Sequence, residues 1–337
     1  MSKKNSSVNL KNGFKDFKDL SKVFSNFKLK LNALNKKKYV VAVSGGPDSL
    51  GLVALTQAYK YQKETKFYYI LVDHNIRKNS NREAIKVKGL LKKNKVDLKI
   101  FINKKKISKN IQAEARIARY DILIKFCRKY NVKALLTAHN LEDQVETFFI
   151  RLSRGSGLKG LSAMKQINKI NNQVSLCRPV LDVKKKFLVK ISKNIFGKYF
   201  KDPSNKDKKF LRTKIRNLKK PLEKTGIKYE QIFRSIQNLS ASKSTLEEYL
   251  NNIFKEVVKK ENKKILIDFE KYKKLNKDIK LALINHSIKK LKNNYYDLRS
   301  KKLENLIKNL SKGSFKQSTL GGCIFFKKGG DLCLKIE

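Results

Sequence analysis

Short apolar runs alternate along the chain with longer segments whose apolar residues recur at helical spacing. The short runs, rich in β-branched and aromatic residues, are residues 39–43, 67–72, 98–102, 134–138 and 175–181. The helix-like segments are residues 49–63, 81–95, 110–130, 141–153 and 183–197. Because the short runs do not alternate apolar with polar positions, they predict strands buried on both faces of a parallel sheet. Repeated strand–helix units of this kind predict an α/β fold with a doubly wound parallel sheet.

The pattern differs on either side of these units. Apolar residues recur at helical spacing between residues 14 and 34, and no strand–helix alternation remains after Pro221. Near the end, two β-like runs flank the turn sequence KGGD at 328–331, which indicates a small hairpin. The expected domains are an N-terminal helical segment at 1–35, the sheet domain at 36–220, a C-terminal helical domain at 221–310 and a short β segment at 311–337.

Unusual polar residues follow four of the predicted strands. They are SGGPDS at 44–49, VDHN at 72–75, TAHN at 137–140 and Arg178 with Pro179. Ligands of open α/β sheets bind beyond the carboxyl ends of the strands. These segments therefore predict a single site at one edge of the sheet.

The turn SGGPDS has the composition of an anion site. Gly45 and Gly46 allow a close backbone approach to a ligand, and the next helix presents free N–H groups. Ser44 and Ser49 add hydroxyl donors, whereas Asp48 would repel a bare phosphate unless a divalent cation joins the two. The spacing matches neither GxxxxGK[ST] nor GxGxxG, which disfavours a Walker NTPase and a dinucleotide dehydrogenase.

Charge suggests a polyanionic partner without deciding its identity. The formal net charge is +52, and 12 of the 80 basic residues are Arg. Such an excess favours nucleic acid. Lys, Asn and Ile all have AT-rich codons, however, so charge alone leaves RNA binding open.

The remaining composition favours a cytoplasmic protein with no membrane partner. No apolar run reaches the ~18 residues of a membrane span, and the first residues lack the apolar core of a secretory signal. The four cysteines stand far apart without a CxxC pair, which fits a reducing compartment and argues against a zinc or iron–sulfur site: Cys127, Cys177, Cys323 and Cys333.

Several of these motifs resemble those of known enzyme families. SGGPDS after a buried strand resembles the pyrophosphate loop (PP-loop) of N-type ATP pyrophosphatases. The chain is further similar to the tRNA(Ile)-lysidine synthetase family in motifs that occur in order and at similar spacing: VDHNIR (72–77), AEARIARYDIL (113–123), the 28-residue block at 137–164, RPVL (178–181) and DPSN…FLRTKIR (202–216). The likeness is strong over 36–220 and returns weakly at TLGGC (319–323). Asn75 departs from the family, which favours Gly there, as does Thr213, where Asn is expected.

The resemblance implies an ATP-dependent ligase. In that family the C2 oxygen of the wobble cytidine in the CAU-anticodon isoleucine tRNA attacks the α phosphate of ATP, and free lysine then displaces AMP. The implied cofactors are ATP and Mg²⁺, with Asp48 as the metal ligand. The implied ATP-binding residues are Ser44, Gly45, Gly46, Pro47, Asp48, Ser49, Val72, Asp73 and His74.

The second step needs a carboxylate that holds the lysine ammonium and takes its proton. His139, Asp143 and Glu146 stand at i, i+4 and i+7, so a helix would present them on one face. With Asp48 they are the expected catalytic residues: Asp143 and Glu146 for lysine, His139 for phosphate or proton handling. A hydrogen-bonded core histidine is the alternative for His139. Glu142 and the Lys runs at 104–106 and 184–186 are expected to be solvated.

The sparse arginines are the expected tRNA contacts, because guanidinium forks suit phosphates. Seven of them lie in the family motifs: Arg116, Arg119, Arg151, Arg154, Arg178, Arg212 and Arg216. The helical domain would also contact tRNA. Surface salt bridges are the alternative role for each arginine pair, and the sequence leaves the oligomeric state, homodimer included, open.

Two other functions fit part of the pattern. A PP-loop thiolase would need a sulfur-carrying cysteine near the site, commonly in a CxxC pair. A non-catalytic basic RNA-binding protein would give no ATP–pyrophosphate exchange, with or without tRNA.

Overall fold

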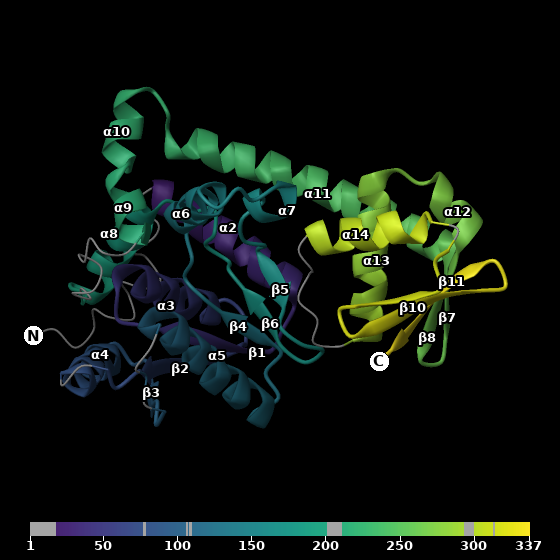
Figure 1. Cartoon of the computed structure of the whole chain (residues 1–337). Coiled ribbons are helices and arrows are strands. Elements are labelled where there is room, and N and C mark those ends of the chain that lie inside the picture. The colour runs from purple at the N-terminus through teal and green to yellow at the C-terminus, as the bar shows by residue number, and fades with distance from the viewer. Residues whose placement is uncertain are drawn as a thin grey trace, which may run out of the picture. The chain divides into compact units, whose positions relative to one another are not determined.

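The computed structural model describes residues 18–76, 79–105, 107, 110–200, 211–292, 300–312 and 314–337. The chain divides into two compact units, one ending at Leu239 and the other beginning at Ser240. Each unit has its own hydrophobic core, and Figure 1 labels the helices and strands of both.

The first unit is built on a six-stranded sheet. Its strands are β1 (Lys38–Val43), β2 (Lys66–Asp73), β3 (Leu98–Ile102), β4 (Ala134–Leu136), β5 (Ile167–Lys169) and β6 (Ser175–Cys177). Their order is β3-β2-β1-β4-β6-β5, and every neighbouring pair is parallel except β5 with β6. The predicted parallel sheet is confirmed. Sequence analysis missed the antiparallel edge strand β5, whose three exposed residues carry no apolar pattern.

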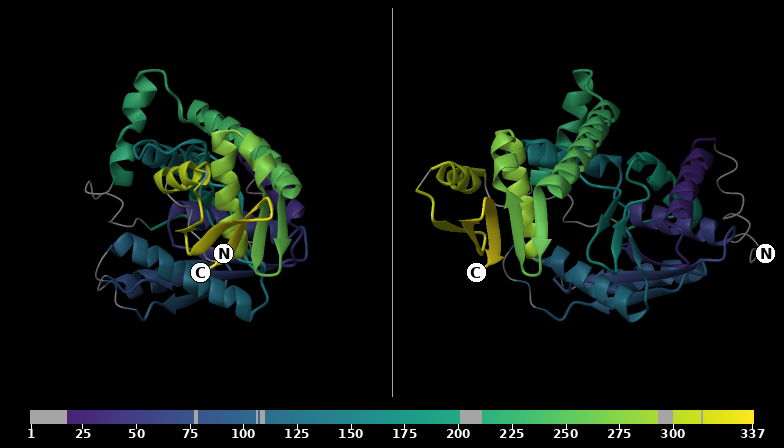
Figure 2. Two further views of the ribbon diagram at one scale, coloured as in Figure 1. Left: turned by 45° about the vertical axis from the view of Figure 1, so that its right-hand side comes forward. Right: turned by 90° about the vertical axis from the view of Figure 1, so that its right-hand side faces the viewer.

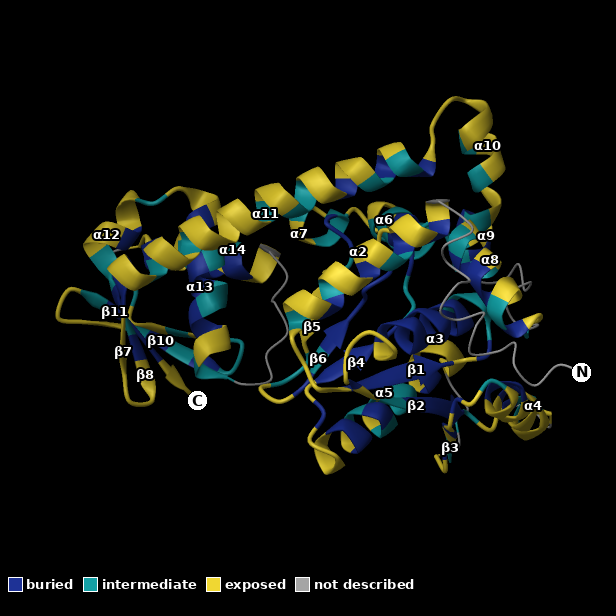
Figure 3. Cartoon of the chain, turned by 180° about the vertical axis from the view of Figure 1, so that it is seen from behind, coloured by how far each residue is buried: buried dark blue, intermediate teal, exposed yellow. Residues whose placement is uncertain are grey.

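Helices cover both faces of this sheet. The described helices of this unit are α2 (Lys18–Leu34), α3 (Pro47–Lys60), α4 (Ser80–Lys93), α5 (Ile111–Lys129), α6 (Leu141–Leu152), α7 (Leu158–Leu161), α8 (Lys185–Phe196), α9 (Leu211–Asn217), α10 (Lys219–Lys224) and the start of α11 (Tyr229–Val257). Alternate residues of β1 enter different cores: Val41 packs with α2, α3 and α8, whereas Val40 packs with α5. This two-sided burial, visible as dark strands in Figure 3, explains why the strands read as continuous apolar runs.

The second unit contains an antiparallel sheet and three further helices. These elements are β7 (Val258–Glu261), β8 (Lys264–Asp268), α12 (Phe269–Lys274), α13 (Lys277–Leu291), α14 (Ser300–Leu310), β9 (Gln317–Leu320), β10 (Cys323–Lys328) and β11 (Asp331–Ile336). The expected terminal hairpin is confirmed as β10 with β11, and it lies in a sheet of order β7-β8-β11-β10-β9, drawn in green to yellow in Figure 2. The expectation of helices alone before residue 311 was wrong, because β7 and β8 form a hairpin there. None of the described helices is long and apolar enough to cross a membrane.

Gly45 fixes the turn between β1 and α3. Its φ is +78°, and a Cβ placed there would lie 2.5 Å from Cγ2 of Val87, a buried residue of α4. The position therefore excludes a side chain for two reasons, backbone conformation and space. Gly155 has a similar φ of +67° with nothing within 4 Å of its added Cβ, so it offers a matched control.

We predict that Gly155→Ala lowers the free energy of unfolding by about 1 kcal/mol, the cost of a left-handed alanine. Gly45→Ala adds the collision with Val87 and should cost at least about 2 kcal/mol. Urea denaturation of the two variants measures the difference. Equal losses would show that Val87 yields freely and that close packing does not shape this turn.

Candidate active site

Ser49 organises the turn after β1. Its hydroxyl donates to the Gly46 carbonyl at 2.9 Å and accepts from the Ser44 backbone N–H at 3.2 Å. The Ser44 hydroxyl lies 3.1 Å from the same oxygen. Gly46 is the N-cap of α3 and Pro47 its first residue, so proline takes a position that needs no backbone donor. The turn thus presents the start of α3 with its positive dipole end toward the sheet edge.

Asp48 is a carboxylate with one satisfied oxygen. Its Oδ2 lies 3.3 Å from Lys185 Nζ, whereas its Oδ1 is buried without a hydrogen-bond partner. Burial raises the pKa of Asp48 to about 6, an effect that Lys185 opposes and the nearby Asp143 reinforces. A buried carboxylate oxygen that has no protein partner and lies beside an anion turn suits a divalent cation held partly by phosphates.

Asp73 ends the neighbouring strand β2 in a similar state. Its Oδ1 accepts from the Asn75 N–H at 2.9 Å, and its Oδ2 is buried without a partner. Val72 is buried beneath it, and His74 follows it at the strand end. Asn75 has a φ of +52°, which explains the departure from glycine, since Asn tolerates this region better than most residues.

His139 lies at the end of β4 as a neutral ring. Its Nδ1 is 2.9 Å from the Thr137 hydroxyl. Burial, followed by the charges of Arg178 and Arg116, lowers the pKa of His139 well below its usual value. The ring can therefore exchange hydrogen bonds near neutral pH but brings no positive charge to a phosphate.

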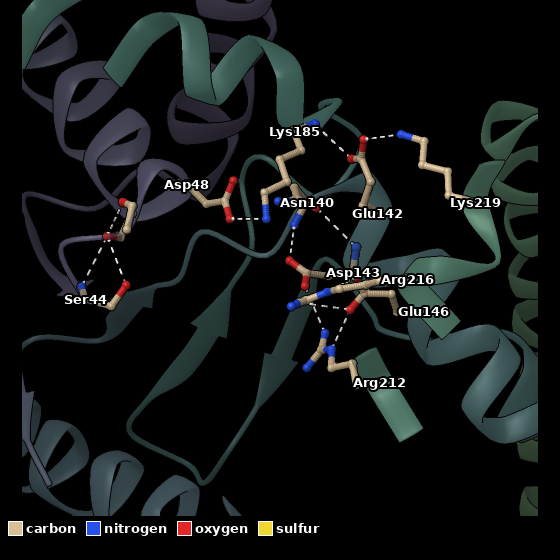
Figure 4. A network of polar contacts seen from close by, with 12 residues as sticks. Ser44, Asp48, Asn140, Glu142, Asp143, Glu146, Lys185, Arg212, Arg216 and Lys219 are labelled. Atoms are coloured by element: carbon tan, nitrogen blue, oxygen red, sulfur yellow. Dashed lines mark hydrogen bonds and ion pairs between the residues drawn. The ribbon is translucent and has the colours of Figure 1, made fainter. Parts of the chain in front are cut away.

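The expected carboxylate face of α6 is present and is filled by arginines. Asn140 and Asp143 form a reciprocal capping box that fixes the start of the helix. Arg212 of α9 donates from Nη2 to Asp143 Oδ1 at 2.9 Å and from Nε to Glu146 Oε2 at 2.5 Å. Arg216 donates from Nε to Glu146 Oε1 at 2.6 Å (Figure 4). Glu146 is only 3% exposed, so its charge is balanced almost entirely inside the protein.

The seven arginines expected at tRNA fall into two groups. Four are engaged within the protein: Arg212 and Arg216 hold carboxylates, Arg151 donates to the Gly160 and Ala163 carbonyls at 2.7 Å, and buried Arg178 donates to the Lys165 carbonyl at 2.7 Å. The other three are Arg116, Arg119 and Arg154. Arg116 and Arg154 are exposed, and the Arg116 guanidinium lies 5.0 Å from the Tyr120 ring centroid.

The expectation that Glu142 is solvated was wrong, and the partly exposed 184–186 run at the start of α8 also forms specific ion pairs. Glu142 accepts from the Lys185 backbone N–H at 2.8 Å and pairs with Lys219 at 3.3 Å. Within the 184–186 run, Lys184 pairs with Glu230 and Lys185 with Asp48. The position of the run in the sequence could have indicated these contacts. It lies at the start of α8, after β6, and the carboxyl end of β6 belongs to the same sheet edge.

The chain is similar to known proteins over most of its length. Residues 18–222 match the model of the PP-loop domain family. The chain is 32% identical over 324 residues to the tRNA(Ile)-lysidine synthase of Wolbachia pipientis wMel, covering 95% of this chain and 75% of that protein. It is 30% identical over 324 residues to the synthase of Rickettsia akari (strain Hartford), covering 94% and 74%. Among solved structures, the U34-tRNA thiolase NcsA from Methanococcus maripaludis shares the fold, with a TM-score of 0.55, 20% identity and coverage of 66% of this chain and 80% of that one.

The glycine turn and the parallel sheet thus define a PP-loop domain, a class of proteins that use ATP. The extent and identity of the matches go further. The chain belongs to the family of tRNA(Ile)-lysidine synthases.

The burial of Asp48 yields a stability prediction. Because its folded-state pKa is raised from 3.8 to about 6, the native state loses stability as pH rises through this interval, and the cost is complete above pH 6. Asp48→Asn should therefore raise the free energy of unfolding of the ligand-free protein by about 1–3 kcal/mol at pH 7.5. The gain should shrink at pH 5.

Chemical denaturation at the two pH values measures this effect. The exposed Asp121 of α5 serves as the control, since Asp121→Asn should change stability little at either pH. A destabilised Asp48→Asn at pH 7.5 would mean that the Lys185 pair outweighs the burial cost.

Proposed function

We propose that this protein joins free lysine to C2 of the wobble cytidine of the CAU-anticodon isoleucine tRNA, consuming ATP and forming lysidine, AMP and pyrophosphate. The observation that supports it most is that two kinds of carboxylate lie at one sheet edge. Asp48, at the anion turn, has a buried oxygen without a protein partner, and Asp143 and Glu146 bind cationic side chains. The first suits a metal–polyphosphate, and the second suits an ammonium.

In the first step the cytidine O2 forms a bond to the α phosphorus of ATP. The bond from that phosphorus to the bridging oxygen breaks, and its electron pair leaves with pyrophosphate. Ser44, Ser49 and the N–H groups at the start of α3 bind the polyphosphate. Asp48 Oδ1 and Asp73 Oδ2 fit Mg²⁺, which prefers one or two carboxylates plus phosphate oxygens and would neutralise the developing charge.

In the second step the lysine ε-amine attacks C2 and AMP departs with the C2–O electron pair. The ammonium must first lose a proton, and a carboxylate beside it can hold the group and accept that proton. Asp143 is better placed for this than Glu146, because its side chain is 17% exposed against 4%. Lysine would compete with Arg212 for Asp143 Oδ1, while Glu146 keeps α9 in place through both arginines.

The tRNA contacts are assigned to the exposed basic side chains. Arg116 and Arg154 are free to meet phosphates in a way that Arg151 and Arg178 are not. The lysine excess adds a sequence-independent attraction to the RNA backbone.

Sulfur transfer is the weaker candidate. All four cysteines are at most 2% exposed, and burial raises the pKa of Cys127 to about 12 and that of Cys177 to about 11. A thiol in this state is a poor nucleophile at neutral pH.

The direct test is incubation of the protein with ATP, lysine and the isoleucine tRNA, followed by mass spectrometry of the anticodon nucleoside. Lysidine at the wobble position is the expected product. ATP–pyrophosphate exchange that depends on tRNA but gives no lysidine would point to a different nucleophile, and no exchange at all would point to a binding protein.

Asp143→Asn should separate the two steps. The variant keeps the size of the side chain but loses the charge that holds lysine, at a cost of about 1.5–3 kcal/mol, or a roughly 10- to 150-fold higher lysine requirement. Pyrophosphate release should persist, so adenylated tRNA accumulates. A single-turnover time course follows pyrophosphate, adenylated tRNA and lysidine separately, with Asp121→Asn as the control. Equal loss of both steps with unchanged lysine dependence would remove Asp143 from the lysine site.

Arg151→Ala and Arg154→Ala should have different effects, the first on protein stability and the second on tRNA binding. Arg151→Ala removes a charged donor from the Gly160 and Ala163 carbonyls, of which Gly160 keeps the Ala163 N–H at 3.0 Å, and should lower the free energy of unfolding by about 1–3 kcal/mol. Arg154→Ala should leave stability within about 0.5 kcal/mol but reduce the log–log salt slope of tRNA binding by about 1. Filter binding across a salt series, beside urea denaturation, distinguishes the two. A slope unchanged in Arg154→Ala would exclude it as a phosphate contact.

A further inference from the structure

Lys185 forms an ion pair with Asp48, the carboxylate of the PP-loop. It is the first residue of α8, and its Nζ lies 3.3 Å from Asp48 Oδ2. Its backbone N–H donates to Glu142 Oε2 at 2.8 Å. Lys185 therefore links the SGGPDS turn (44–49) to the start of α6, because its side chain contacts Asp48 and its backbone N–H contacts Glu142 (Figure 4).

The main chain of Lys185 is held firmly. A Cβ added at Gly51 of α3 would lie 3.0 Å from the Leu188 carbonyl, so α8 packs against α3 at backbone distance. Upstream, Lys30 of α2 donates to the Pro179 carbonyl and pairs with Asp182, which fixes the segment leading into α8. The side chain is less constrained, since 41% of it is exposed.

Ligand binding would change the partner of this ammonium. Asp48 Oδ2 holds Lys185 in the ligand-free protein, while Oδ1 stays buried and unpaired. A divalent cation on Asp48 would satisfy the carboxylate and repel the ammonium, and the accompanying polyphosphate would offer it new acceptors. The lysine ammonium has three donor hydrogens and a flexible four-carbon side chain, so it can move from Asp48 to a nearby phosphate while the backbone stays in place.

We propose that Lys185 is a phosphate-binding catalytic residue that leaves Asp48 when ATP binds and contacts the pyrophosphate portion. This role rests on the proposed function for its chemical step. As the bond between the α phosphorus and the bridging oxygen breaks, negative charge grows on pyrophosphate, and the Lys185 ammonium donates hydrogen bonds to it. Lys185 transfers no proton and forms no covalent bond.

Binding of products tests this assignment without tRNA or turnover. Titration calorimetry of the full chain, with Mg²⁺ present, compares pyrophosphate with AMP. Lys185→Ala should weaken pyrophosphate binding about 10- to 150-fold, as expected for a lost charge-assisted contact, and should change AMP binding less than about 3-fold. Lys185→Arg should restore most of the pyrophosphate affinity.

Two neighbours provide matched controls. Lys184 pairs with Glu230, and Lys186 is exposed with its Nζ 5.2 Å from the Phe187 ring centroid. Lys184→Ala and Lys186→Ala remove the same charge from the same stretch of helix and should leave pyrophosphate affinity within about 3-fold of the parent. Losses as large as that of Lys185→Ala would overturn the proposal, because the effect would then be one of general charge.

Two further results would also overturn it. One is pyrophosphate affinity that Lys185→Ala leaves unchanged. The other is an equal loss of pyrophosphate and AMP binding together with a lower unfolding midpoint, which would make Lys185 a structural residue. A selective pyrophosphate loss in a protein that forms no lysidine would support the role of Lys185 while refuting the proposed function, so the two failures are distinguishable.

Discussion

The candidate site is organised around one negative charge, that of Asp48, held in the first turn of α3 just beyond the buried strand β1. Asp48 sits where the chain leaves β1, a position that costs free energy because the carboxylate is largely removed from water. Lys185 compensates only one of its oxygens. Without a ligand, the protein would be more stable with a neutral residue at position 48. The carboxylate is understandable as a group whose burial cost is offset when a cation and phosphates bind.

The carboxylates of α6 show the opposite arrangement. Glu142, Asp143 and Glu146 are each paired with a basic group from another element, so their charges are balanced before any ligand arrives. Removing one partner from a buried pair is far more costly than removing a surface pair. The α6–α9 contact therefore positions a cation-binding surface, and the lysine of the proposed reaction would have to compete there with Arg212 for Asp143.

The arginines illustrate how one residue type serves two purposes. Arg151 and Arg178 donate to the backbone carbonyls of Gly160, Ala163 and Lys165, which lie outside the strand ladders. Arg116 and Arg154 remain on the surface, where a basic side chain can meet RNA. The net charge counts both groups of arginines equally, but only the exposed arginines can contribute to salt-dependent binding of RNA.

The sequence by itself determined the parallel sheet, the glycine turn and the family, because apolar periodicity and contiguous motifs are local properties. It also placed Asp143 and Glu146 on one face, since helical spacing fixes that relation. Tertiary structure decided the rest. Lys185, Arg212 and Arg216 reach their carboxylates across 66 to 137 positions of chain. The strands β7 and β8 form by pairing with each other, and β8 also pairs with β11. Partners chosen across such distances depend on packing between elements, which no local pattern of residues encodes.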